Sequence, residues 1–162
     1  MKVYIGADHA GFELKAFIVD SLRAKGVAIE DCGSHIYDPS DDYPDIIRST
    51  IKKFLVDVNE EADSRAIVIG ASGQGEAIVA NRFKGVRCAL YYGAPRGTQT
   101  DSSGHELSMI ESTRAHNESN VLALAARFMT PEEALRAVEI WLKTPFSGED
   151  RHTKRVWQID SA

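Results

Sequence analysis

The hydrophobic pattern of this chain changes repeatedly between two periods, and each change marks an expected element. Short apolar runs rich in β-branched residues are typical of buried strands, whereas apolar residues at every third or fourth position are typical of amphipathic helices. Strands are expected at 2–6, 27–32, 66–69, 86–92 and 120–124. Helices are expected at 12–25, 44–58, in the stretch that ends at 81, at 107–115 and at 130–143.

Strands and helices alternate along the chain, which predicts an α/β fold. We expect a Rossmann-like three-layer sandwich around a five-stranded parallel sheet, with the flavodoxin-like strand order 2-1-3-4-5. In that order the loops after strands one and three, at 7–11 and 70–76, meet at the carboxyl edge of the sheet. The 162 residues suit a single domain built around one core.

Composition limits the partners and the cellular compartment that we expect for this protein. Hydrophobic residues make up 43% and charged residues 27% of the chain, and no apolar run approaches membrane-spanning length. The net charge of −5 argues against general affinity for nucleic acid. Cys32 and Cys88 have no metal or redox spacing, and the first strand begins at once without a signal-peptide pattern. We expect a cytoplasmic protein with no membrane or nucleic-acid partner.

The most informative stretch is 66–81, where an apolar strand passes through a glycine-rich loop into a helix. Three glycines between 70 and 75 allow a ligand to approach the backbone closely. Ser72 supplies a hydroxyl, and Glu76 supplies a carboxylate that the helix dipole should keep ionised. The loop lacks the dinucleotide and P-loop signatures, and Gln74 replaces the last glycine of a nucleophile elbow. An anion site is one interpretation, and an ordinary strand-to-helix turn is the other.

Polar residues at two other turns are less specific candidates. Asp8 and His9 follow the first strand, where helix caps and solvated groups are the ordinary alternative. His116 and Asn117 end a predicted helix, where the helix dipole alone favours a histidine. Each pair therefore has a structural interpretation beside the functional one.

Three arginines are further candidates, each with a structural alternative. Arg127 follows the fifth strand, where a surface salt bridge is the ordinary alternative. Arg151 and Arg155 lie four residues apart, so a helical tail would put both on one face. Such a pair either forms a solvated basic face or holds one phosphate between two guanidinium groups.

Taken together, these motifs resemble one protein family. The run Gly6–Lys15, which reads Gly-Ala-Asp-His-Ala-Gly-Phe-Glu-Leu-Lys, resembles the sugar-phosphate isomerases that include ribose-5-phosphate isomerase type B. The resemblance continues in four further motifs in the same order and covers nearly the whole chain. These motifs are Asp42–Asp45, Gly70–Asn81, His116–Arg127 and Gly148–Val156.

The resemblance implies a homodimer, or a dimer of such dimers, that interconverts aldose and ketose phosphates through a cis-enediol without a metal or other cofactor. Ribose 5-phosphate and ribulose 5-phosphate, which belong to the pentose phosphate pathway, are the implied substrate and product. In this family the neighbouring subunit completes each site. The tail 148–162 is expected to serve phosphate binding or the dimer contact.

The resemblance also implies a role for each candidate. His116 opens the sugar ring, Glu76 moves a proton between two carbons, and Ser72 helps to stabilise the enediolate oxygen. The implied substrate contacts are Asp8, His9, Tyr43, Ala71, Gly73, Gln74, Gly75 and Asn117. The implied phosphate ligands are Arg127, Arg151 and Arg155.

The chain departs from the family at two places. One branch of the family uses a cysteine directly after strand three, but Gly70 stands there in this chain. The other branch uses a glutamate in the following helix, and the run Ser72–Glu76 matches that branch, so Glu76 is the expected base. The segment 93–105 is longer than the family's usual connection after strand four, which leaves the exact sugar open.

Three other functions stay open at this point. An isomerase of a four- or six-carbon sugar phosphate would use the same mechanism, and a panel of aldose phosphates separates it from a pentose enzyme. A non-catalytic module that binds a phosphorylated metabolite would exchange no substrate proton with solvent. A serine hydrolase would use Ser72 and His116 and would react with a serine-directed reagent, although Gln74 weakens its motif.

Overall fold

The computed structural model describes residues 1–59, 63–95, 97, 99–102 and 104–161. Its strands are β1 (Lys2–Ala7), β2 (Ala28–Asp31), β3 (Ser64–Gly70), β4 (Cys88–Tyr91), β5 (Gln99–Thr100), β6 (Glu106–Leu107) and β7 (Val121–Ala125). Its helices are the short 3-10 helix η1 (His9–Gly11), α1 (Phe12–Ala24), α2 (Tyr43–Asn59), α3 (Gln74–Ala80), α4 (Met109–Ala115), α5 (Pro131–Lys143) and α6 (Asp150–Asp160). Every strand and helix expected from the hydrophobic pattern is present within two residues of its expected bounds.

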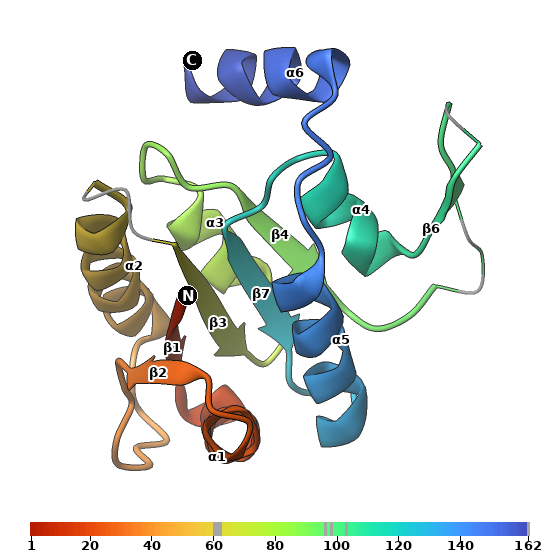
Figure 1. The fold of residues 1–162 in the computed structure, drawn as a ribbon. Coiled ribbons are helices and arrows are strands. Elements are labelled where there is room, and N and C mark those ends of the chain that lie inside the picture. The colour runs from red at the N-terminus through yellow and green to blue at the C-terminus, as the bar shows by residue number, and fades with distance from the viewer. Residues whose placement is uncertain (60–62, 96, 98, 103, 162) are drawn as a thin grey trace.

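Five of the strands form one parallel sheet, with helices on both of its faces (Figure 1). Buried residues of α1 and α5 share one hydrophobic cluster with the sheet, and buried residues of α2 and α3 share the other. The predicted α/β class and the five-stranded parallel sheet are therefore confirmed.

The expected order of the strands is wrong at one end of the sheet. The observed order is β2-β1-β3-β7-β4, so the fifth strand along the chain lies inside the fourth. All five residues of β7 are buried, and such an apolar strand belongs in the middle of a parallel sheet. Only Tyr91 is buried in β4, which takes the edge. There the Asn81 side chain bonds both backbone groups of Cys88, as a neighbouring strand would.

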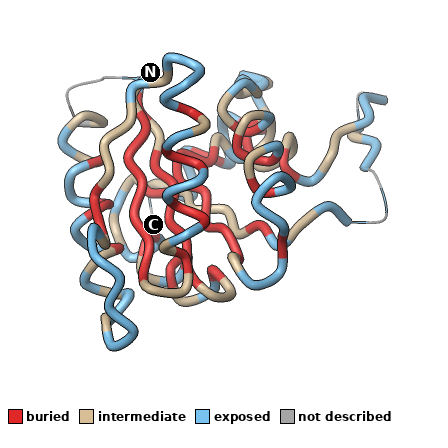
Figure 2. Tube along the Cα trace, turned by 90° about the horizontal axis from the view of Figure 1, so that it is seen from below, coloured by how far each residue is buried: buried red, intermediate tan, exposed pale blue. Residues whose placement is uncertain are grey.

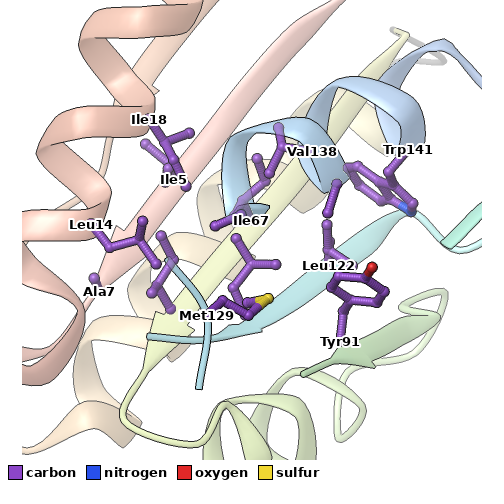
Figure 3. Close-up of a cluster of buried hydrophobic side chains, with 14 of the residues drawn as sticks. Ile5, Ala7, Leu14, Ile18, Ile67, Tyr91, Leu122, Met129, Val138 and Trp141 are labelled. Atoms are coloured by element: carbon purple, nitrogen blue, oxygen red, sulfur yellow. The ribbon is translucent and has the colours of Figure 1, made fainter. Parts of the chain in front are cut away.

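The larger hydrophobic cluster fixes α1 and α5 on the sheet. Figure 3 shows Ile5 and Ile67, from neighbouring strands, on the same side of the sheet as Ile18 and Val138 from the two helices. Trp141 is fully buried, and its indole N–H donates a hydrogen bond of 2.8 Å to Ser119 Oγ. Figure 2 shows that the strands in the interior are mostly buried, whereas the outer surfaces of the helices are exposed. This rigid interior determines where the loops at the two edges of the sheet emerge.

Two segments outside the main sheet contain structure that the hydrophobic pattern does not predict. The segment 93–105 leads into a small antiparallel hairpin of β5 and β6, although some of its residues lie outside the described ranges. The tail forms α6, which lies beyond the amino ends of the sheet strands (Figure 1). Over the residues that the structure describes, no helix combines the length and apolarity needed to cross a membrane.

Candidate active site

The carboxylate of Glu76 lies at the carboxyl end of β3, in the space beside Gly70. Glu76 belongs to the first turn of α3, and only 4% of its surface is exposed. A Cβ atom placed on Gly70 would stand 2.0 Å from Glu76 Oε1 and 2.2 Å from its carboxyl carbon. The missing side chain at position 70 therefore makes room for the carboxylate.

Burial raises the pKa of Glu76 above that of an ordinary glutamate, and the negative charge of Asp8 raises this pKa further. A hydrogen bond from its own backbone N–H acts in the opposite direction but is the smaller effect compared with burial. The helix start was expected to favour the ionised form, and burial outweighs that influence. A carboxylate with a raised pKa suits a base that takes and returns protons near neutral pH.

The glycine-rich loop packs so closely on its neighbours that larger residues do not fit. Gly73 has a φ of 69°, and a Cβ atom there would stand 3.0 Å from the backbone of Leu124. Gly75 touches the ring of Tyr43, the first residue of α2, because a Cβ atom at Gly75 would stand 2.6 Å from the ring carbon Cζ. The loop thus brings the candidate Tyr43 against the turn that carries Glu76.

Hydrogen bonds fix the rest of this loop. The Ser72 hydroxyl oxygen accepts the backbone N–H of Gln74 at 3.4 Å, and the Gln74 side-chain amide donates to the hydroxyl of Tyr92 at 2.9 Å. The Ala71 carbonyl accepts the backbone N–H of Arg127 at 3.1 Å. The loop is therefore tied to the ends of both β4 and β7.

His9 is paired with an aspartate that the sequence motifs did not single out. The Nδ1 atom of His9 lies 2.7 Å from Asp41 Oδ1, and the backbone N–H of His9 donates to the same oxygen at 3.1 Å. The pairing with Asp41 raises the pKa of His9, and the positive charge of Arg127 opposes this rise. Arg127 therefore contributes to the electrostatic environment of His9.

Asp8 has a structural task beside any contact with substrate. It is 6% exposed, and its Oδ1 atom accepts the backbone N–H groups of Ala10 and Gly11 at 3.0 and 3.1 Å. The ligand atoms of Asp8, His9 and Asp41 lie within 4.8 Å of one another, as cation ligands do. The hydrogen bond between His9 and Asp41 already engages two of the three groups.

The second group of candidates gathers around His116, the C-cap of α4. Its ring packs on the ring of His152 from α6, with centroids 4.3 Å apart and planes at 34°. His152 is 3% exposed, and its Nδ1 atom lies 2.7 Å from Ser147 Oγ. Burial lowers the pKa of His152, and the charges of His116 and Arg151 lower it further. Asn117 is exposed and lines a surface pocket beside Ser119.

Two of the candidate arginines project from α6. Arg151 Nε lies 2.9 Å from Glu149 Oε2, and an Arg151 terminal nitrogen lies 4.0 Å from Asp101 Oδ2. The same Asp101 oxygen lies 3.8 Å from His116 Nε2. Arg155 is exposed one turn further along α6, and its charge also acts on the pKa of His152. The arginines of α6 therefore lie on the same side of the molecule as His116.

Within one chain the two groups lie at opposite ends of the sheet strands, one at their carboxyl ends and the other at their amino ends. The first group consists of Asp8, His9, Tyr43, the loop Gly70–Glu76 and Arg127 and follows the carboxyl ends of the strands. The second consists of His116, Asn117, Arg151 and Arg155. His116 comes before β7, whereas Glu76 comes after β3, and these strands run parallel. A strand of this length spans about 15 Å, so one chain does not bring Glu76 and His116 together.

Sequence reasoning missed three residues of these groups: Asp41, Asp101 and His152. Asp41 directly precedes the motif that begins at Asp42, and His152 lies inside the motif around Arg151, so both had a local signal. Asp101 lies in the long segment without periodicity, where no pattern distinguished it from other polar residues.

The two cysteines are poor nucleophiles in this fold. Both are free thiols, and burial raises the pKa of Cys32 to about 11 and that of Cys88 to about 12. A thiol must lose its proton to act as a nucleophile or base, so neither is suited to catalysis at neutral pH.

Comparison with known proteins gives a consistent result over the whole chain. The family model described as Ribose/Galactose Isomerase matches residues 3–159. The ribose-5-phosphate isomerase B of Mycobacterium tuberculosis is 37% identical over 156 residues, which cover 96% of this chain and 86% of that protein. The corresponding protein of Mycolicibacterium paratuberculosis is 36% identical over 156 residues, covering 96% of this chain and 87% of that one.

The solved structures that resemble this chain belong to the same kind of enzyme as these relatives. The ribose 5-phosphate isomerase of Thermotoga maritima is similar with a TM-score of 0.81 and 35% identity, covering 99% of this chain and 98% of the other. The ribose-5-phosphate isomerase B of Mycoplasma genitalium, solved with bound ribulose-5-phosphate, has a TM-score of 0.82 and 31% identity, covering 99% and 94%. Sequence and fold thus lead to one assignment: the chain belongs to the ribose/galactose isomerase family.

Proposed function

We propose that this protein interconverts ribose 5-phosphate and ribulose 5-phosphate. The observation that carries the proposal is the Glu76 carboxylate, buried beside Gly70 at the edge where the strand loops converge, with its pKa raised by burial. Relatives that match nearly the whole chain are named for this reaction, and one was solved with ribulose-5-phosphate.

The proposed chemistry begins with opening of the sugar ring. His116 gives a proton to the ring oxygen, the bond between that oxygen and the first carbon breaks, and the proton of the first-carbon hydroxyl passes through water back to His116 as the aldehyde forms. Glu76 then takes the proton from the second carbon, which leaves a cis-enediolate. Ser72 and nearby backbone N–H groups stabilise the enediolate oxygen. The hydroxyl of the second carbon gives its proton to the oxygen of the first carbon, and Glu76 returns its proton to the first carbon, so the ketose forms and the carboxylate is regenerated.

We propose that each active site combines two chains of a homodimer. Glu76 and Arg127 would come from one chain, and His116 with the arginines of α6 from its partner. The separation of these groups within one chain supports this arrangement. Exposed apolar side chains also support it, since Ile78 on α3 is 62% exposed, and Trp157 and Ile159 on α6 are 68% and 52% exposed. The tail 148–162 would then serve both the contact and the phosphate.

We assign the protein to a reducing compartment, the cytoplasm. Two unpaired thiols, Cys32 and Cys88, suit such a compartment better than an oxidising one. The assignment also suits an enzyme of intermediary sugar metabolism.

A panel of four-, five- and six-carbon aldose phosphates tests the substrate. Ribose 5-phosphate should give ribulose 5-phosphate at the highest kcat/KM, and Glu76→Gln should abolish turnover while ribose 5-phosphate still binds. A higher kcat/KM for another chain length would move the assignment to that sugar. Binding of every sugar phosphate without turnover, or turnover of Glu76→Gln within tenfold of the parent enzyme, would contradict the proposal.

A further inference from the structure

The long connection after β4 brings a carboxylate to the His116 group. Asp101 lies between the two strands of the β5–β6 hairpin, yet only 6% of its side chain is exposed. Its Oδ1 atom accepts the backbone N–H of His105 at 3.0 Å, which fixes the side chain within its own turn. Its Oδ2 atom lies 3.8 Å from His116 Nε2 and 4.0 Å from a terminal nitrogen of Arg151.

This position is the one that a bound phosphate ester is expected to approach. In the proposed function His116 meets the sugar ring and Arg151 meets the phosphate, so the substrate lies against both groups. Asp101 Oδ2 is within ion-pair range of both of them. The Nε atom of Arg151 is meanwhile 2.9 Å from Glu149, on the other side of the guanidinium group.

We propose that Asp101 sets the affinity of the site for phosphate by competing with the substrate phosphate for Arg151. The proposal rests on the proposed function for the roles of Arg151 and His116. The carboxylate neutralises part of the positive charge that a phosphate would meet. A phosphate that binds Arg151 is then either repelled by the Asp101 carboxylate or must displace that carboxylate from Arg151. The longer connection of this chain therefore weakens phosphate binding and raises the KM for sugar phosphates.

The burial of Asp101 makes this effect strong. Charges near a protein surface are screened by salt, whereas buried charges are screened much less. Like charges brought together at a binding site weaken affinity considerably. Removing the charge at position 101 should therefore tighten the binding of phosphate by about tenfold at low ionic strength.

The opposite role for Asp101 makes the opposite prediction. A carboxylate beside an imidazole can also orient it and stabilise its protonated form, as in acid–base pairs of enzymes. If Asp101 helped His116 in this way, removing its charge would lower kcat and would leave phosphate binding unchanged. The two roles are therefore separated by the direction in which affinity moves.

The test compares Asp101→Asn with Glu106→Gln in the full-length protein. Asparagine keeps an oxygen for the His105 N–H and removes only the charge. Glu106 is exposed on β6 of the same hairpin, so its variant removes an equal charge without touching Arg151. The Kd of inorganic phosphate is measured by calorimetry, and the KM of ribose 5-phosphate is measured in parallel.

Asp101→Asn should lower the Kd of phosphate and the KM of ribose 5-phosphate by about tenfold each, whereas Glu106→Gln should change both less than twofold. Partial unfolding cannot produce tighter binding, and Asp101→Ser gives a second variant with the same expectation. An unchanged or weaker affinity for phosphate, or an equal gain in Glu106→Gln, would overturn the role of Asp101. Tighter phosphate binding without any isomerase activity in the parent protein would instead overturn the proposed function alone.

Discussion

At the scale of single residues, Gly70 and Glu76 depend on each other. The family resemblance predicts a base either directly after strand three or in the following helix, and Gly70 and Glu76 occupy these two positions. The Glu76 carboxylate fills the volume that a side chain at position 70 would take. In this chain a glycine at position 70 is therefore needed for the Glu76 carboxylate to lie where it does.

Glu76→Gln should make the protein more stable at neutral pH while removing isomerisation. The folded-state pKa of Glu76 is raised, so the folded protein is most favoured when this group is protonated, and that stability is lost as pH rises through the raised pKa. Glutamine does not ionise, so the Glu76→Gln variant keeps this stability as the pH rises. The gain in Tm over the parent protein should therefore be present at pH 7 and shrink toward pH 4. A gain that persists unchanged at pH 4, or a lower Tm at pH 7, would contradict the account of Glu76.

Gly70→Ala should reduce kcat by at least about tenfold, because a displaced catalytic group loses its alignment with the reacting carbon. The new Cβ atom would stand 2.0 Å from Glu76 Oε1, so the carboxylate must move. Gly97→Ala serves as control, since no atom of the described part of the chain lies within 4 Å of a Cβ atom at that exposed position. Equal kcat values for the two variants would show that the packing of Gly70 on Glu76 has no catalytic importance.

The residue scale also shows what sequence can and cannot provide. Glu76 was identifiable because its loop motif is local. Its raised pKa was not, because burial depends on how the loop folds back over β3 and past Asp8. The pairing of Asp41 with His9 and of Asp101 with His116 was not predictable either, since each pair is brought together by residues far apart in the chain.

At the scale of elements, local patterns predicted existence better than arrangement. The helix beginning at Thr130-Pro131 was predicted from its cap signals, and the structure has both hydrogen bonds of that capping box. The order of β4 and β7 was not predictable from either strand alone, because it depends on which strand can be buried on both sides. The β5–β6 hairpin was missed because strands of two residues carry no periodicity.

The capping box of α4 offers a test of how an element supports the site. Ser108 and Glu111 form this box, and the helix ends at His116. Ser108→Ala should lower the free energy of unfolding by about 1 kcal/mol and reduce kcat severalfold, because a frayed helix holds His116 less well. Ser112→Ala, at a half-buried position in the middle of the same helix, should leave both quantities nearly unchanged. Unequal stability but equal kcat values would show that α4 does not position His116.

Helix α6 allows a similar comparison between neighbouring cations. Arg155→Ala should raise the KM for ribose 5-phosphate strongly, since removing one partner of a buried charge pair typically costs about 2–5 kcal/mol once the complex has formed. Lys154 is also exposed on α6 and has no proposed contact with phosphate, so Lys154→Ala should change KM less than twofold. If the lysine variant matched the arginine variant, α6 would act through its overall charge and not through a directed contact.

At the scale of the whole molecule, the fold separates the two groups of residues that the proposed mechanism brings together. Parallel strands send the loop of Glu76 to one edge of the sheet and the helix of His116 to the other (Figure 1). Lengthening a loop would not reconcile these edges without disrupting the core between them. In the proposed homodimer, the His116 group of one chain would lie beside the Glu76 group of its partner.

Subunit mixing tests this account most directly. Glu76→Gln and His116→Asn are prepared separately, each nearly inactive as a homodimer, and their subunits are allowed to exchange, with differently tagged chains reporting the exchange. A mixed dimer then has one doubly damaged site and one intact site. Ribose 5-phosphate isomerase activity should appear on mixing and approach roughly one quarter of the parent value at equal amounts of the two chains. Confirmed exchange without any recovery of activity would mean that Glu76 and His116 do not meet across two chains.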